Sequence, residues 1–171
     1  MTEWRECKLG DIVVFNYGKA LPENKRIAGN IPVYSSAGLT GYHNESIVSE
    51  KGIIIGRKGT IGKVYYSNSP FYCIDTAFFI KESKSYCLKY IYYLLQTLGL
   101  DELNEDSAVP GLNRNTAYQQ DISLPDGECK FPYLYIGQQT IICLRFGRKK
   151  WENGVEPYRQ YRGRQRMLRL R

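Results

Sequence analysis

One short stretch near the middle of the chain restricts the possible folds most. Residues 52–62 read Gly-Ile-Ile-Ile-Gly-Arg-Lys-Gly-Thr-Ile-Gly and continue into Lys-Val-Tyr-Tyr. Isoleucine and tyrosine fit a pleated, half-buried surface, whereas Gly56 and Gly59 permit positive φ. The pattern therefore predicts a strand, a tight turn at 56–59 and a second strand. Arg57 and Lys58 would stand at the tip of this rigid hairpin.

The basic tip has two interpretations that the sequence leaves open. It is either a solvated turn, as most surface charges are, or a phosphate or nucleic-acid contact to which the glycines give access. A Walker phosphate loop does not fit, because Arg57 occupies the position of its first glycine and Val64 that of its Ser or Thr. The residues that follow also predict a strand rather than a helix.

Length and composition predict one folded domain with room for an appendage. The 171 residues are 43% hydrophobic, without an apolar run long enough to cross a membrane or an apolar leader at the start. We therefore expect a cytoplasmic protein without a membrane partner. Its five cysteines are odd in number and include no Cys-x-x-Cys pair, so we expect neither a disulfide framework nor a zinc site, and no cofactor.

The positive charge is concentrated at one end. Residues 1–144 contain 14 Lys and Arg against 15 Asp and Glu, whereas residues 145–171 contain 10 against 2. The net charge of +7 is therefore weak evidence for nucleic-acid binding by the folded part, which would need a local patch.

The rest of the chain alternates short strands with loops. We expect a turn at 10–11, a long loop over 15–30, strands at 31–34 and 72–80, a helix over 88–100 that ends near Gly99, and a last strand at 122–125. The helical spacing makes the tyrosines of 88–100 packing residues. Core candidates near the start are Leu9, Ile12, Val13 and Val14.

Three polar segments supply candidate ligand contacts. The long loop carries Lys25 and Arg26, and the segment 35–43 offers the small hydroxyls of Ser35 and Ser36 and the rings of Tyr42 and His43, although a simple connecting turn explains it equally well. Asn and Arg make bidentate contacts to base edges, so the run Asn113, Arg114, Asn115 is a third candidate. The same run is compatible with a helix cap.

Evidence for catalysis is weak. Residues 68–71, Asn-Ser-Pro-Phe, only partly match the Asn-Pro-Pro-Phe/Tyr motif of amino-methyltransferases, and no glycine-rich cofactor loop precedes them, so we interpret them as a turn. The carboxylates at 101–106 are typical of a solvated acidic loop, and Asp75 has no catalytic companion in the sequence. We expect no enzymatic activity in this chain.

Taken in order, these segments resemble a target-recognition domain of the DNA-specificity subunit of type I restriction–modification systems. The matching pieces are Trp4 with Lys-Leu-Gly-Asp-Ile at 8–12, Ile-Pro-Val-Tyr-Ser-Ser-Ala-Gly at 31–38, the stretch 52–62, the helix at 89–100, Pro-Gly-Leu-Asn-Arg at 110–114 and Ile-Ser-Leu-Pro at 122–125. The resemblance implies an α/β (α+β) domain with a twisted, mainly antiparallel sheet and flanking helices. It also implies contact with half of a bipartite double-stranded DNA site, and partnership with a methyltransferase subunit and through it the restriction subunit. A chain with one such domain would act as a half-subunit that forms a homodimer.

The departures from the family pattern begin after Pro125, and residues 136–142 only echo its Glu-Gln-x-x-Ile helix start. We expect the recognition domain to occupy residues 1–125, followed over 126–171 by a linker and a basic tail in which the coiled-coil helix of the family is not evident. One hypothesis is that the tail is out of frame, which would make the chain a truncated, non-functional fragment unable to dock its methyltransferase. The competing hypothesis is a native basic arm that adds phosphate contacts.

Overall fold

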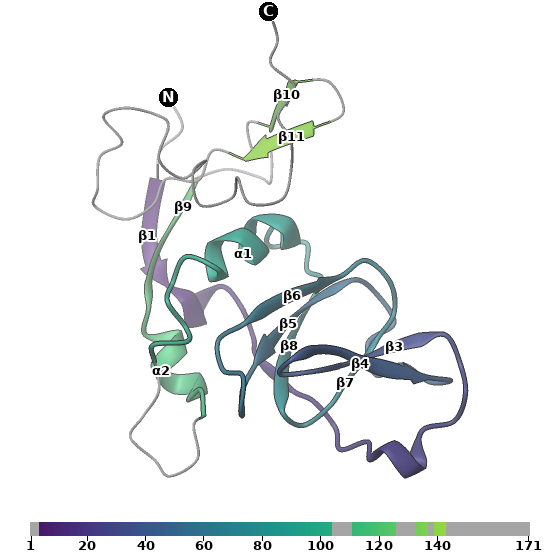
Figure 1. Ribbon diagram of the computed structural model, residues 1–171. Helices are drawn as coiled ribbons and strands as arrows, with labels where there is room; N and C mark the ends of the chain where they lie inside the picture. Colours follow the sequence, from purple (N-terminus) through teal and green to yellow (C-terminus); the bar gives the residue numbers. More distant parts are fainter. Residues whose placement is uncertain (1–3, 104–110, 126–132, 137–138, 143–171) are drawn as a thin grey trace, which may run out of the picture.

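The computed structural model describes residues 4–103, 111–125, 133–136 and 139–142 (Figure 1). Its strands are β1 (Trp4–Lys8), β2 (Asn16–Tyr17), β3 (Ile31–Ser35), β4 (Gly38–His43), β5 (Gly52–Gly56), β6 (Val64–Ser67), β7 (Tyr72–Cys73), β8 (Ala77–Lys81), β9 (Asp121–Pro125), β10 (Tyr133–Ile136) and β11 (Gln139–Ile142). The helices are α1 (Leu88–Leu95) and α2 (Arg114–Tyr118), with 3-10 turns η1 (Leu9–Asp11) and η2 (Glu23–Lys25).

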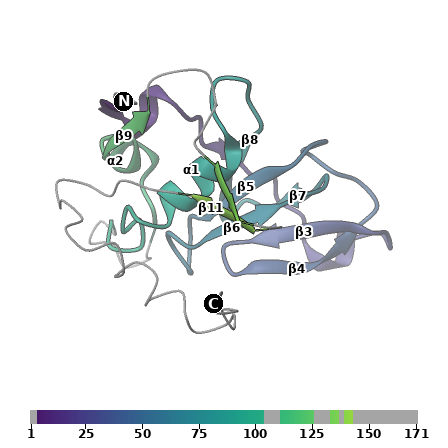
Figure 2. The ribbon, with the colours of Figure 1, turned by 90° about the horizontal axis from the view of Figure 1, so that it is seen from above.

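The described strands form four small sheets. Their orders are β2-β8-β5-β6, β4-β3-β7, β1-β9 and β10-β11, and every pairing is antiparallel except the short parallel one between β3 and β7. Helix α1 packs against β5 and β6, while α2 packs against η1 (Figures 1 and 2). The predicted mainly antiparallel fold with flanking helices is thus confirmed.

Strand β5 is the centre of the core because it is buried on both faces. Ile53 and Ile55 belong to one apolar cluster with α1, whereas Ile54 belongs to a second cluster with Phe71 and Phe79. All three isoleucines are fully buried. A strand covered on both sides is expected to be continuously apolar, and each buried isoleucine contributes roughly 1.5–3 kcal/mol.

The connection between β5 and β6 is longer than predicted. The strand resumes at Val64 rather than at Thr60, so residues 57–63 form a loop in place of a four-residue turn. Gly59 has a φ of +75°, as expected, and Gly62 has a φ of +70°. Gly56 is required for space instead, because a Cβ there would lie 1.9 Å from the carbonyl oxygen of Thr60.

Further expectations needed correction, beginning with the strand at 72–80, which the structure divides into β7 and β8. Val14 is 64% exposed and lies outside the core, whereas Leu9 and Val13 are buried as predicted. Helix α1 ends at Leu95 rather than near Gly99, whose φ of +59° falls in the turns that follow. Strand β9 is not the last one, since β10 and β11 pair after it.

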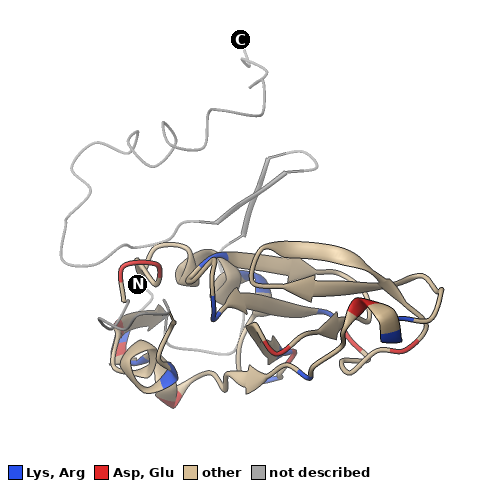
Figure 3. Cartoon of the chain, turned by 60° about the horizontal axis from the view of Figure 1, so that its bottom comes forward, with Lys and Arg blue, Asp and Glu red and all other residues tan. Residues whose placement is uncertain are grey.

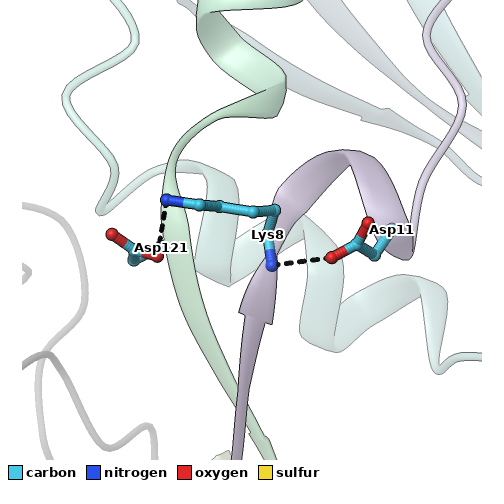
Figure 4. A network of polar contacts seen from close by, with 3 residues as sticks. All are labelled: Lys8, Asp11 and Asp121. Atoms are coloured by element: carbon cyan, nitrogen blue, oxygen red, sulfur yellow. Dashed lines mark hydrogen bonds and ion pairs between the residues drawn. The ribbon is translucent and has the colours of Figure 1, made fainter.

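The first and ninth strands are joined along their whole length. Their register runs from Trp4 opposite Pro125 to Lys8 opposite Asp121. The ammonium of Lys8 forms an ion pair of 2.8 Å with Asp121, and its backbone N–H donates to the carboxylate of Asp11 at 3.0 Å (Figure 4). Lys8 thereby connects β1, η1 and β9.

The two hypotheses about the tail, that it is out of frame or a native basic arm, concern residues that after β11 lie outside the described ones. Within the described ranges no helix is long and apolar enough to cross a membrane. In the same ranges, no cluster of His, Cys, Asp and Glu could hold a metal ion.

Candidate nucleic-acid interface

The β5–β6 loop and the start of α2 meet although they are far apart in the sequence. The N–H of Leu112 donates to the carbonyl of Arg57 at 2.8 Å, and Lys58 forms an antiparallel bridge with Gly111. The predicted contact residues at 57–58 and 113–115 are therefore brought side by side.

Thr76, the residue directly before β8, anchors this region. Its carbonyl accepts the backbone N–H groups of both Arg57 and Lys58 at 3.0 Å, and its hydroxyl accepts the N–H of Ser36 at 3.3 Å. The β3–β4 turn is thus fixed beside the basic loop. Thr76 was not predicted, because nothing in its local sequence distinguishes it from an ordinary strand residue.

Tyr17 lies where the two arginines converge. The guanidinium carbon of Arg57 is 4.8 Å and that of Arg114 is 5.1 Å from the centroid of the Tyr17 ring, which is half exposed. Sequence analysis missed Tyr17; its only local signal is an aromatic residue next to Gly18 in a predicted loop. We call Tyr17, Arg57, Lys58, Arg114 and Asn115 the Tyr17 surface.

The arginines of the Tyr17 surface are held without carboxylates. Arg57 donates from Nη1 to the carbonyl oxygen of Asp75 at 3.0 Å, and Arg114 lies 5.9 Å from the ring centroid of Tyr118. Among the described residues, neither arginine nor Lys58 forms an ion pair; the pairs present there join Lys8, Lys51 and Lys63 to carboxylates elsewhere. Described carboxylates therefore do not neutralise this surface, although basic (blue) and acidic (red) residues are scattered over the described chain (Figure 3).

Asn113 acts as a helix cap. It is the N-cap of α2, and its side-chain oxygen accepts the N–H of Asn115 at 2.8 Å. This confirms the cap interpretation, and base reading by the remaining amide donors stays a prediction. Asn115 is exposed beside it.

A second group of predicted residues lies at the opposite end of the β3–β4 hairpin. Arg26 donates from Nη1 to the carbonyl of Thr40 at 2.7 Å, which fixes the loop that contains the exposed Lys25 against β4. Tyr42 is 53% exposed on that strand. The structure thus divides the predicted contact residues between two ends of one hairpin.

Three of the predicted contact residues are engaged in packing or hydrogen bonds within the domain. His43 is buried: its Nδ1 accepts the N–H of Ile27 at 3.0 Å, and its ring packs edge-on against Tyr72. Ser36 is 8% exposed, and Ser35 closes the hairpin turn by accepting the N–H of Ala37 and donating to the carbonyl of Gly38. Local packing accounts for all three, so we leave them out of the proposed contact surface.

The sequence matches the family described as type I restriction modification DNA specificity domain over residues 1–142. The chain belongs to this family. The predicted resemblance is confirmed, and the match continues past Pro125 through β10 and β11. No curated protein matches the sequence.

Solved structures share the specificity-domain fold. The type I restriction–modification S subunit from M. genitalium aligns with a TM-score of 0.64 and 14% identity, covering 72% of this chain and 35% of that one. The HsdS subunit from Thermoanaerobacter tengcongensis aligns at 0.53 and 16%, covering 71% and 33%. A chain from a type I R-M system, studied for complex assembly and conformational transition, aligns at 0.55 and 13%, covering 71% and 34%. This specificity-family chain thus spans about a third of each structure.

Proposed function

We propose that this chain recognises one half of a bipartite double-stranded DNA site as the specificity component of a type I restriction–modification complex. The observation that carries the proposal is the Tyr17 surface. Within a DNA specificity domain, three cations that form no ion pair with a described residue come from two distant segments and meet beside an exposed asparagine. Arginine and lysine contact phosphates and guanine edges, and asparagine contacts adenine edges.

In this proposal the Tyr17 surface makes the main DNA contacts, and the residues at the far end of the β3–β4 hairpin extend them. Arg57, Lys58 and Arg114 make phosphate or guanine contacts, with Asn113 and Asn115 beside them. Lys25, Arg26 and Tyr42 extend the contact to the far end of the β3–β4 hairpin. The chain catalyses nothing itself and works in the cytoplasm. It directs a methyltransferase subunit and, through it, a restriction subunit, and two copies read two half-sites.

Selection from a random duplex pool tests this function. The full chain is incubated with the pool, alone and together with a type I methyltransferase subunit, and bound sequences are read. Enrichment of one defined motif supports recognition, and a gapped palindrome supports a paired half-subunit. No enrichment in either arm would contradict the proposal and favour the alternative of a disabled fragment. Translating the nucleotide sequence in the other frames near residues 126 and 144 tests that alternative, which fails if no heptad-patterned helix results.

A further inference from the structure

We propose that Tyr17 is a positioning residue whose ring sets the spacing of Arg57 and Arg114, so that both guanidinium groups engage the same stretch of DNA backbone. This inference rests on the proposed function and adds the device that organises its cations. Tyr17 itself needs no contact with DNA.

The ring of Tyr17 is itself firmly placed. Backbone pairing sets Tyr17 opposite Phe78 in β8, and the N–H of Gly18 donates to the carbonyl of Ala77 at 3.2 Å. The Tyr17 and Phe78 rings pack edge-on with centroids 5.0 Å apart. Tyr17 is nevertheless 50% exposed, so one part of the ring is anchored and the rest is available to the arginines.

The two arginines reach this ring from separate elements. Arg57 comes from the β5–β6 loop and also lies 5.6 Å from the centroid of Phe78, while Arg114 comes from the first residue of α2. The Nε of Arg114 is buried and has no hydrogen-bond partner among the described residues. The centroids of the Tyr17 and Tyr118 rings lie 5.1 and 5.9 Å from its guanidinium carbon, and we infer that these two rings orient the group.

The spacing of the charges indicates an anionic ligand. Each guanidinium carbon lies about 5 Å from the same ring centroid, so the two are at most about 10 Å apart. This is close to the screening length of roughly 8–10 Å in physiological salt, so the charges repel each other in the free protein. With no described carboxylate paired to either, a phosphate backbone relieves this repulsion when it binds.

Substitutions at Tyr17 test the inference. The quantity measured is the affinity of the full chain for a short fluorescein-labelled DNA duplex of mixed sequence, at several salt concentrations. We expect Tyr17→Phe to bind within about twofold of the unmodified chain, because the ring is kept, and Tyr17→Leu to bind about five- to tenfold more weakly. The basic tail is the same in every variant, so only differences between variants are compared. Tyr93→Leu is the matched control: Tyr93 is half-buried, packs edge-on against Tyr92 and belongs to α1, which contributes no residue to the Tyr17 surface.

A double-mutant cycle separates positioning from mere structural support. If Tyr17 acts through Arg57, then Arg57→Ala weakens binding less in the Tyr17→Leu background than in the unmodified chain. Purely additive effects would overturn the inference. Phenylalanine and pentafluorophenylalanine at position 17 both keep the shape of the ring, but only the fluorinated ring reverses its charge distribution. Weaker binding by the fluorinated form than by Tyr17→Phe therefore supports positioning even if Tyr17→Leu folds poorly.

Comparing the arginine variants with the Tyr17 variants also distinguishes failure of this inference from failure of the proposed function. Weaker binding by Arg57→Ala and Arg114→Ala, with unchanged binding by Tyr17→Leu, would overturn only the role of Tyr17. Absence of binding by the unmodified chain, or full binding by both arginine variants, would overturn the role of the Tyr17 surface as a whole.

Discussion

The backbone N–H of Phe15 donates a 2.7 Å hydrogen bond to the hydroxyl oxygen of Tyr118, which lies 103 positions later in the chain. Phe15 is fully buried, and the rings of the two residues also pack edge-on with centroids 5.3 Å apart. This contact ties the segment that leads into β2 and Tyr17 to the helix that carries Arg114. The placement of Tyr17 relative to Arg114 therefore depends on this contact.

Tyr118→Phe should lower the free energy of unfolding by about 1–3 kcal/mol, because it leaves the buried N–H of Phe15 without an acceptor. Urea denaturation measures the loss. Tyr65→Phe is the control: Tyr65 is half-buried, and its hydroxyl forms no hydrogen bond within the described residues, so its change should stay below about 0.5 kcal/mol. Equal effects of the two substitutions would contradict the importance of the Phe15–Tyr118 bond.

Alanine substitutions at two glycines of the β5–β6 loop should differ strongly. Both Gly59 and Gly62 have positive φ, which costs an alanine about 1–2 kcal/mol. A Cβ at Gly59 approaches only the hydroxyl of Ser36, at 3.8 Å, whereas one at Gly62 would lie 2.2 Å from the backbone nitrogen of Asp101. We expect Gly62→Ala to lose at least about 3 kcal/mol. Thermal unfolding compares them, and a similar loss at both positions would show that the loop moves freely away from Asp101.

Substitutions at Asn113 separate its role as the helix cap of α2 from its proposed role in reading a base. Asn113→Ala removes the cap of α2 and should cost about 1 kcal/mol, whereas Asn113→Ser keeps a capping oxygen and should cost much less. Both remove the amide. If the amide reads a base, duplex selection with Asn113→Ser should give a motif relaxed at one position while stability is kept. An unchanged motif would leave Asn113 with the capping role alone.

Tyr90 should make stability depend on alkaline pH. Burial raises its pKa to about 12, and its hydroxyl donates to the carbonyl of Ser123 at 2.8 Å. The unfolded chain releases this proton near its ordinary pKa of 10.0, so the folded state holds more protons between about pH 10 and 12 and loses stability as the pH rises through that window.

The substitution Tyr90→Phe isolates this contribution. It should cost about 1 kcal/mol at neutral pH, where the hydrogen bond to Ser123 is lost. The difference from the unmodified chain should shrink as the pH approaches about 11, since the unmodified chain alone loses this contribution. Urea denaturation across this range measures both, and a difference that stays constant would refute the linkage.

The sequence pattern predicted most elements because local signals dominated there. Three consecutive isoleucines can only be buried, and the helical spacing that begins at Leu88 survives in α1. The pattern did not show that β5 is covered on both faces, because that depends on the packing of Phe79 from β8 and of Phe71, which precedes β7. The length of the β5–β6 loop depends in the same way on the contact of Gly62 with Asp101.

The sequence predicted the basic residues of the candidate site but not how they are arranged around Tyr17. Arg57, Lys58 and Arg114 stand out as basic residues in glycine-rich or turn segments, and the structure brings them together. Nothing local indicates that Tyr17 lies between two arginines that are distant in the chain. Tyr17 was missed, whereas His43 was predicted wrongly to be accessible. A lone histidine after a tyrosine suggests a ligand contact, but the register of β4 against β3 buries it.

The pairing of β1 with β9 has a consequence for how such a domain is inherited. Since the first and ninth strands lie antiparallel over their full length, the polypeptide enters and leaves the intervening structure at one place. A unit whose ends are adjacent can be inserted into a longer polypeptide, duplicated or exchanged by recombination with little disturbance to its host. Changing the DNA sequence that a host complex reads would then require the exchange of a single gene segment, while the rest of the host protein remains as it was.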